Sequence, residues 1–124
     1  LPIRGYHPLV GAARPDFFRE EQMAVSVQVI YPITEGTTFD YDYYADKHMK
    51  LVDQTMGPHL QSMVVTKGLA GGPDTPPDFF AVATFVFADE AAMNAAMANS
   101  GALGEDLANF TNVAPKFLIG EVIA

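Results

Sequence analysis

The chain has 124 residues and a mass of 13.4 kDa, which is the size of one domain. It contains no cysteine, which excludes a disulfide scaffold, thiol catalysis, iron–sulfur clusters and zinc sites built from cysteine. Its net charge of −8 argues against nucleic acid or an anionic membrane surface as a partner. The sequence has no run of about 18 apolar residues and therefore predicts no membrane span. We expect a cytoplasmic protein.

Charge divides the chain near residue 22. The three arginines, Arg4, Arg14 and Arg19, lie in residues 1–22, where three acids bring the net charge to zero. This stretch has no sustained helical or alternating period, and it lacks the apolar run of about 7–15 residues that marks a secretory signal. We therefore expect an N-terminal extension ahead of a single domain, residues 23–124.

The first half of the domain predicts a strand, a helix and a second strand. Polar and apolar residues alternate over 24–31, which is typical of a strand. A helix is predicted over about 41–56, with Asp40 as its N-cap and a Gly-Pro pair at its end. Residues 60–67 predict the second strand, and the glycine- and proline-rich run 68–77 predicts a loop.

The second half repeats this plan. Residues 79–87 form a strongly apolar strand, and Asp89 predicts the N-cap of a helix over about 90–99. A short helical turn is expected around 103–108, followed by a last strand over 116–123. The order β-α-β-β-α-β predicts an α+β, ferredoxin-like fold, with four antiparallel strands in one sheet and both long helices on one face.

The sheet face that the helices leave open is predicted to be apolar. Both faces of the strand 79–87 carry large apolar side chains, whereas a face in water usually has a polar residue at every second position. Leaving about six such side chains wet costs on the order of 10 kcal/mol. We therefore expect a homodimer in which two sheets pack face to face; the alternative is that residues 1–22 cover this face within one chain.

One stripe of the first helix carries the candidate chemistry. Helical spacing places five residues on one stripe, which is the most apolar of the helix and is expected to face the sheet: Tyr44, His48, Leu51, Val52 and Thr55. His48 is therefore a candidate proton shuttle, with Tyr44 either orienting it or donating to a developing oxyanion. The alternative is a structural histidine whose partner is a backbone carbonyl or a tyrosine hydroxyl.

Other motifs predict structure and not chemistry. His59 is placed to cap the end of the first helix, and no spacing of histidines and acids indicates a metal site. The glycine run 68–72 is followed by proline and not by a helix, so it predicts a turn and not a phosphate loop. Four residues predict core packing or the wall of an adaptable pocket: Met93, Met97, Phe110 and Phe117.

Three segments resemble, in the same order, the signature of the EthD family. They are 38–44 with 48–52 (TFDYDYY and HMKLV), 67–72 (KGLAGG) and 109–111 (NFT). Lys50 stands where the family often has proline, and Asn112 stands where the resemblance leads us to expect an acid.

The resemblance implies a dimeric α/β barrel, from a superfamily with small monooxygenases, muconolactone isomerases and haem-dependent relatives. It implies a possible oxidoreductase, or an accessory to one, in the oxidative degradation of small apolar or aromatic compounds such as ethyl tert-butyl ether. The alternatives are a non-catalytic binder or chaperone of such a pathway, and a haem-dependent enzyme. We expect no metal and no required cofactor, with haem and flavin left open, and a ligand site formed by Tyr44, His48, Leu51 and Phe110.

Overall fold

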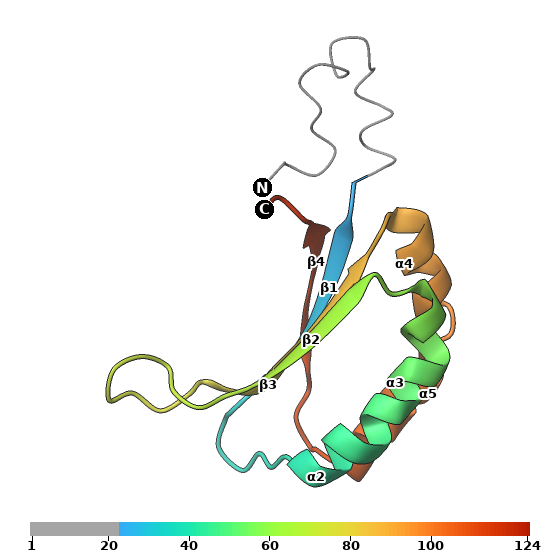
Figure 1. Ribbon diagram of the computed structural model, residues 1–124. Coiled ribbons are helices and arrows are strands. Elements are labelled where there is room, and N and C mark those ends of the chain that lie inside the picture. Colours follow the sequence, from blue (N-terminus) through green and yellow to red (C-terminus); the bar gives the residue numbers. More distant parts are fainter. Residues whose placement is uncertain (1–22) are drawn as a thin grey trace.

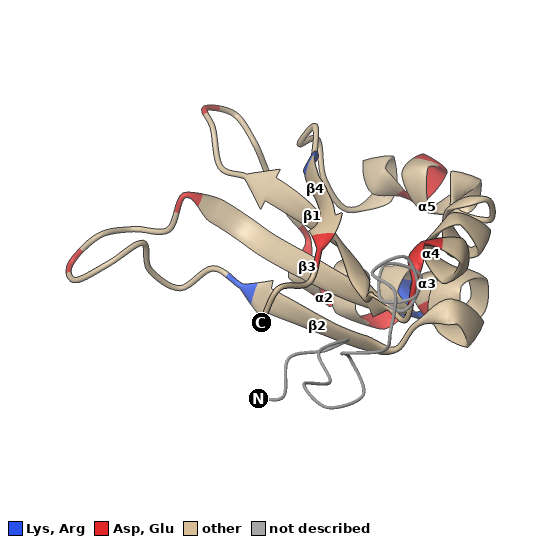
Figure 2. Cartoon of the chain, turned by 90° about the horizontal axis from the view of Figure 1, so that it is seen from above, with Lys and Arg blue, Asp and Glu red and all other residues tan. Residues whose placement is uncertain are grey.

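The computed structural model describes residues 23–124, and the expected extension 1–22 lies outside that part of the chain. The elements follow the predicted order β-α-β-β-α-β, with short helical segments added after each long helix (Figure 1). Four antiparallel strands form one sheet, and two perpendicular views place the helices together on one side of it (Figure 2). The predicted α+β, ferredoxin-like fold is confirmed.

The sheet has the strand order β2-β3-β1-β4, so the two most apolar strands occupy its centre. Its register places Val27 opposite both Phe85 and Ile119, and directly opposed side chains share a face. Each strand begins and ends within two residues of its predicted bounds: β1 (Val25–Pro32), β2 (Ser62–Lys67), β3 (Phe79–Phe87) and β4 (Lys116–Glu121).

The first long helix begins where predicted, because the side chain of Asp40 accepts a hydrogen bond from the backbone N–H of Tyr43 at 3.0 Å. The helix is not uniform along its length. It consists of α2 (Tyr41–Tyr43), a π-helical turn (Tyr44–His48) and α3 (Met49–Met56), and a 3₁₀ turn at Gly57–His59 ends it. The sequence predicts the bounds and the cap but not the π-helical turn.

The second long helix, α4 (Glu90–Met97), begins at Asp89, whose side chain accepts a hydrogen bond from the N–H of Ala92 at 2.8 Å. It ends two residues before its predicted end. The expected helical turn is α5 (Gly101–Asp106) with a 3₁₀ turn, Leu107–Asn109. No helix within residues 23–124 has the length and apolar character needed to span a bilayer.

The core lies between the centre of the sheet and the helices. Its main cluster joins buried side chains of β1 and β3 to the inward face of α3, and it contains Val27, Val52, Met56, Ala83, Phe85, Phe87 and Ala96. A second, largely aromatic cluster surrounds the start of the long helix and contains Tyr31, Tyr44, Ala81, Phe110 and Val113. The odd-numbered residues of β1 and β3 therefore face the helices, and the even-numbered residues form the open face.

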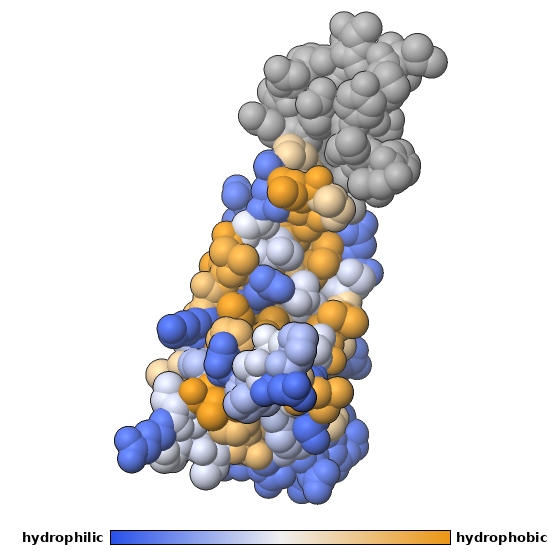
Figure 3. All heavy atoms as spheres, turned by 90° about the vertical axis from the view of Figure 1, so that its left-hand side faces the viewer, coloured by the Kyte–Doolittle hydropathy of each residue, from blue (hydrophilic) through white to orange (hydrophobic). Residues whose placement is uncertain are grey.

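The open face is less uniformly apolar than the sequence predicts. At its centre, the side-chain amide of Gln28 donates a hydrogen bond to the hydroxyl of Thr84 at 3.1 Å. In the same row, Val64 of β2 and Leu118 of β4 are 60% and 57% exposed. Figure 3, which looks onto this side, shows apolar groups separated by polar ones. The exposed apolar surface is thus concentrated on the edge strands.

Residues 68–78 form a long hairpin loop that extends away from the sheet (Figure 1). At its base, the N–H of Gly68 donates a hydrogen bond to the carbonyl of Phe80 at 2.9 Å. A Cβ atom at this position would overlap the backbone carbonyl oxygen of Phe79. The close approach of the two backbone segments at the base of the hairpin therefore requires glycine.

Candidate functional site

The π-helical turn brings the two candidate side chains together. In it the N–H of Met49 bonds to the carbonyl of Tyr44, five residues back, whereas an α-helix pairs residues four apart. Both Tyr44 and His48 are buried, and their rings stack with centroids 5.3 Å apart and planes 22° apart. Single π-helical turns inside helices occur frequently at functional sites.

His48 forms a hydrogen bond with a carboxylate from α5. Its Nδ1 lies 2.9 Å from Oδ2 of Asp106, and the histidine is only 5% exposed. A carboxylate accepts a hydrogen bond and so holds the proton of the imidazole on Nδ1. Nε2 is then the ring nitrogen available to a bound molecule.

Asp106 is held as a carboxylate by several donors. Its Oδ1 accepts hydrogen bonds from the hydroxyl of Tyr43 at 2.7 Å and from the side-chain amide of Asn109 at 2.9 Å. Burial opposes ionisation, but the hydrogen bonds from Asn109, His48 and Tyr43 outweigh it and lower the pKa of Asp106. The bond to this carboxylate also raises the pKa of Tyr43. Asp106 therefore stays ionised at neutral pH and fixes the orientation of the imidazole.

A cavity of about 180 Å³ lies between the long helix, α5 and the sheet. Its wall is mainly apolar, with side chains that include Val27, Val52, Phe85, Met97, Leu103 and Phe117. Its polar side chains are Tyr31, Tyr44, His48 and Ser100. An apolar cavity of about 150 Å³ accommodates benzene, so this one has room for a molecule with a single ring.

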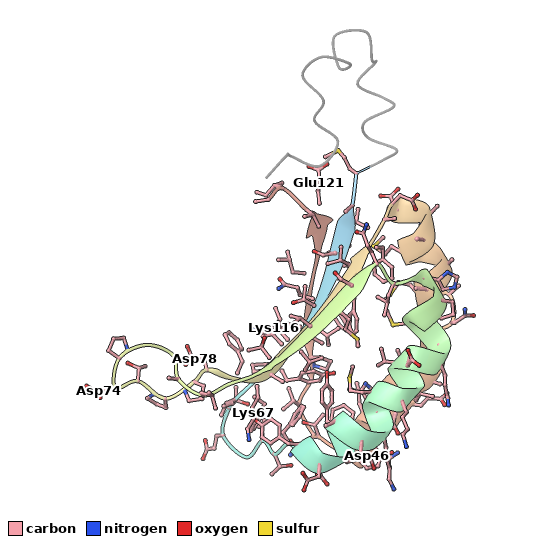
Figure 4. All side chains as sticks on the ribbon, viewed as in Figure 1. Asp46, Lys67, Asp74, Asp78, Lys116 and Glu121 are labelled. Carbon is pink, nitrogen blue, oxygen red and sulfur yellow. The ribbon has the colours of Figure 1, made fainter. Side chains whose placement is uncertain are left out.

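None of the described residues that line the cavity carries a fixed charge. The labelled charged side chains in Figure 4 lie elsewhere: Asp46 is on the outer side of the long helix, and Asp74 and Asp78 are in the hairpin loop. Lys67, at the end of β2, places its ammonium 4.3 Å from the centre of the Tyr41 ring. The cavity is therefore a neutral environment apart from the imidazole.

Two tyrosines of the cavity lie edge to face. The ring centroids of Tyr31 and Tyr44 are 5.8 Å apart, with planes 78° apart, and the two residues are 2% and 4% exposed. Burial raises the pKa of Tyr44 to about 12. Burial, and then the neighbouring hydroxyl of Tyr44, raise the pKa of Tyr31 as well. Both phenols are therefore neutral hydrogen-bond donors at any physiological pH.

The structure brings two of the four predicted ligand-site residues to the cavity. Tyr44 and His48 line it, whereas Leu51 is half-buried on α3 and does not. Phe110 is also absent from the lining, and its ring packs against the imidazole with centroids 4.6 Å apart. The hydrogen bond that orients His48, expected from Tyr44 or a backbone carbonyl, comes from Asp106.

Asp106 and Tyr31 are site residues that the sequence did not predict. Tyr31 follows the alternation of β1 onto the inward face, so a signal for its position is present in the sequence. Asp106 has no such signal, because its partner His48 lies 58 positions away. His59, expected to cap the helix, makes no side-chain hydrogen bond to another residue of 23–124.

The described residues contain no group of three or more His, Asp and Glu side chains arranged to hold a metal ion. Haem and flavin, the two cofactors that the sequence left open, both carry ring systems several times larger than a single ring. Either ring system is larger than the volume of about 180 Å³ beside His48.

Comparison with protein families places this geometry in a known group. The model of the EthD domain matches residues 36–114, well over half of the chain. The chain belongs to the EthD family. A similar solved structure is an EthD-like protein of Ralstonia eutropha JMP134, with 40% identity and a TM-score of 0.74 over 83% of this chain and 95% of that one.

Two further solved structures share the fold. An ethyl tert-butyl ether degradation (EthD) family protein of Bacillus halodurans C-125 has 23% identity and a TM-score of 0.63, over 82% of this chain and 100% of that one. A candidate monooxygenase of Shewanella loihica PV-4 has 16% identity and a TM-score of 0.54, over 82% and 96%. A search of curated proteins finds no match.

The two departures from the EthD signature have local explanations in this family member. Lys50 is on the helix surface, with Nζ 3.8 Å from a carboxylate oxygen of Asp46. Asn112 uses both ends of its amide: Oδ1 accepts from the N–H of Thr38, and Nδ2 donates to the carbonyl of Gly36, both at 2.9 Å. An acid at position 112 would have no N–H for the second bond.

Proposed function

We propose that this EthD-family protein is a small enzyme that moves a proton on a small apolar or aromatic molecule, with His48 as the proton-transfer group. The observation that carries the proposal is the buried imidazole at the cavity wall, with Nδ1 held 2.9 Å from the carboxylate of Asp106. The family relation supports a role in oxidative degradation, either as an oxidoreductase or as an accessory to one.

The geometry suits general acid–base chemistry. Asp106 holds the proton of His48 on Nδ1, so Nε2 accepts a proton from the bound molecule and returns it at another atom. The carboxylate stabilises the imidazolium that forms between these two steps. The mainly apolar wall offers few competing polar groups, which strengthens each of these interactions.

The proposed active form is a homodimer. On the open face, the edge-strand residues Val64 and Leu118 leave more than half of their surface in contact with water. Pairing two open faces would bury them, and it would place the polar pair Gln28–Thr84 at the centre of the interface.

The test is turnover by the full chain of a panel of single-ring compounds of neutral charge. We expect His48→Ala to reduce turnover by about 100- to 10,000-fold, which is the usual contribution of a general acid or base. His59→Ala is the matched control, because it removes a histidine that does not line the cavity. Unchanged turnover in His48→Ala would overturn the proposal.

A non-catalytic binder is the second candidate, and the apolar cavity favours it. It predicts saturable binding of benzene-sized molecules with no compound consumed. It also predicts that replacing Tyr44 and His48 by residues of similar shape leaves the function of the protein in its pathway intact.

A further inference from the structure

Three of the four polar side chains of the cavity lie next to one another. Ser100 is already engaged, since its hydroxyl donates to the carbonyl of Met97 at 2.7 Å. The remaining three are Tyr31, Tyr44 and His48, each at most 5% exposed. The ring of Tyr44 lies between the other two, with centroids 5.8 Å from Tyr31 and 5.3 Å from His48. A hydroxyl donor and a proton acceptor thus lie side by side in the wall of a mainly apolar cavity.

The hydroxyls of Tyr31 and Tyr44 are hydrogen-bonded to each other, whereas Nε2 of His48 has no partner among the described residues. Two hydroxyls that share one hydrogen bond still have one hydrogen to donate, and within residues 23–124 neither that hydrogen nor Nε2 of His48 has a further partner. Buried polar groups without a partner are rare and unfavourable, so their ligand is expected to supply one. The hydroxyl requires an acceptor atom, and the neutral nitrogen requires an acidic hydrogen.

The remaining wall restricts the ligand further. The lining has no lysine or arginine, and the chain carries a net charge of −8, so a carboxylate or phosphate would lack a counter-charge. The volume of about 180 Å³ admits a single ring. A neutral, ring-sized molecule with one acceptor oxygen fits both conditions.

We propose that the substrates are small neutral ketones with a hydrogen on the carbon beside the carbonyl, and that the site interconverts keto and enol forms. This inference rests on the proposed function and names its substrate class. The carbonyl oxygen accepts a hydrogen bond from Tyr44, whose hydroxyl is supported by that of Tyr31. Nε2 of His48 faces the neighbouring carbon.

The reaction needs no oxidant or reductant. His48 takes a proton from the carbon beside the carbonyl, and the electron pair of that C–H bond forms a C=C bond. The π pair of the carbonyl moves onto the oxygen, where the hydrogen bond from Tyr44 stabilises the negative charge. The imidazolium then returns its proton to the oxygen, giving the enol, or to the same carbon, giving back the ketone.

The experiment measures deuterium incorporation into cyclohexanone in deuterated water, by NMR, with the full chain. We expect exchange well above the buffer rate, lost in His48→Ala and reduced about 100-fold in Tyr44→Phe. Tyr41→Phe is the matched control: its hydroxyl donates to the carbonyl of Phe80 at 2.9 Å and does not line the cavity. Binding of toluene, which needs no hydroxyl donor, should be unchanged in Tyr44→Phe.

The outcomes separate this inference from the proposed function. If cyclohexanone exchanges no faster than in buffer while other panel compounds are turned over through His48, the ketone class is wrong and the proposed function stands. Exchange that depends on His48 but is unaffected by Tyr44→Phe overturns the role of the tyrosine. Exchange that survives His48→Ala overturns both.

Discussion

Among the residues that do not touch the bound molecule, Asp106 has the largest predicted effect on kcat. It does not line the cavity and acts through His48, so it is a positioning residue. An asparagine in its place presents either an oxygen or an NH₂ group to Nδ1, and the second leaves the proton on Nε2. We expect Asp106→Asn to lower kcat by about 100-fold or more with little change in KM. Steady-state kinetics on a compound that the wild type consumes would show this; a raised KM with unchanged kcat would contradict it.

The same carboxyl makes stability depend on pH. Its pKa is lower in the folded protein than the ordinary value of about 4. Its contribution to stability is therefore complete above about pH 4 and is lost as the pH falls through the folded value. Urea unfolding should show a smaller loss of unfolding free energy in Asp106→Asn than in the wild type between about pH 6 and about pH 3. Equal losses in both proteins would show that Asp106 is not the group that titrates.

The candidate site was predictable where its residues are local in sequence. Tyr44 and His48 are one helical turn apart, so spacing alone places both toward the sheet. Asp106 reaches His48 only through the packing of α5 against the long helix, and no periodicity reports such a contact. The contact between Asp106 and His48 could therefore be identified only from the structure.

At the scale of elements, the π-helical turn is likewise a feature that the sequence does not predict. An apolar stripe predicts a helix over 41–56 whether or not one turn is widened, because both forms bury similar positions. The stripe does differ in detail: Met56 is buried, whereas Leu51 and Thr55 are only half-buried. Hydrogen-bond geometry, and not composition, separates the two forms.

The base of the hairpin gives a prediction for an element. A Cβ at Gly68 would overlap the backbone carbonyl oxygen of Phe79, so relief requires β2 and β3 to move apart. We expect Gly68→Ala to lower the free energy of unfolding by about 1–3 kcal/mol. Gly101→Ala is the control, because nothing lies within 4 Å of a Cβ there. Thermal and urea unfolding of both variants would measure the difference, and equal stabilities would contradict the close approach.

For the whole molecule, the topology was predictable and the open face only partly so. Each strand and helix follows a local pattern with a clear end, which is why the order β-α-β-β-α-β emerges from the sequence. The polar pair Gln28–Thr84 combines one residue from each of two strands 56 positions apart. The two side chains become neighbours only when the register of β1 and β3 is known. For this reason the sequence predicted an open face that is more apolar than the observed one.

The proposed homodimer is tested at the edge of this face. We expect the wild type to sediment at about twice 13.4 kDa at micromolar concentration. Leu118→Glu replaces an apolar side chain that is 57% exposed and should raise the dissociation constant by about tenfold or more. Ala45→Glu, on the exposed side of the long helix, is the control. A wild type that sediments as a monomer would contradict the homodimer.

The most direct measurement is the nitrogen NMR spectrum of the isotopically labelled histidine rings, with and without phenol or cyclohexanone. At neutral pH we predict that His48 carries its proton on Nδ1, toward Asp106, and that the Nε2 resonance shifts when either molecule binds. The ring of His59 should be unaffected. A His48 ring protonated on Nε2, or an Nε2 resonance unchanged at saturating ligand, would contradict a site in which this nitrogen meets the bound molecule.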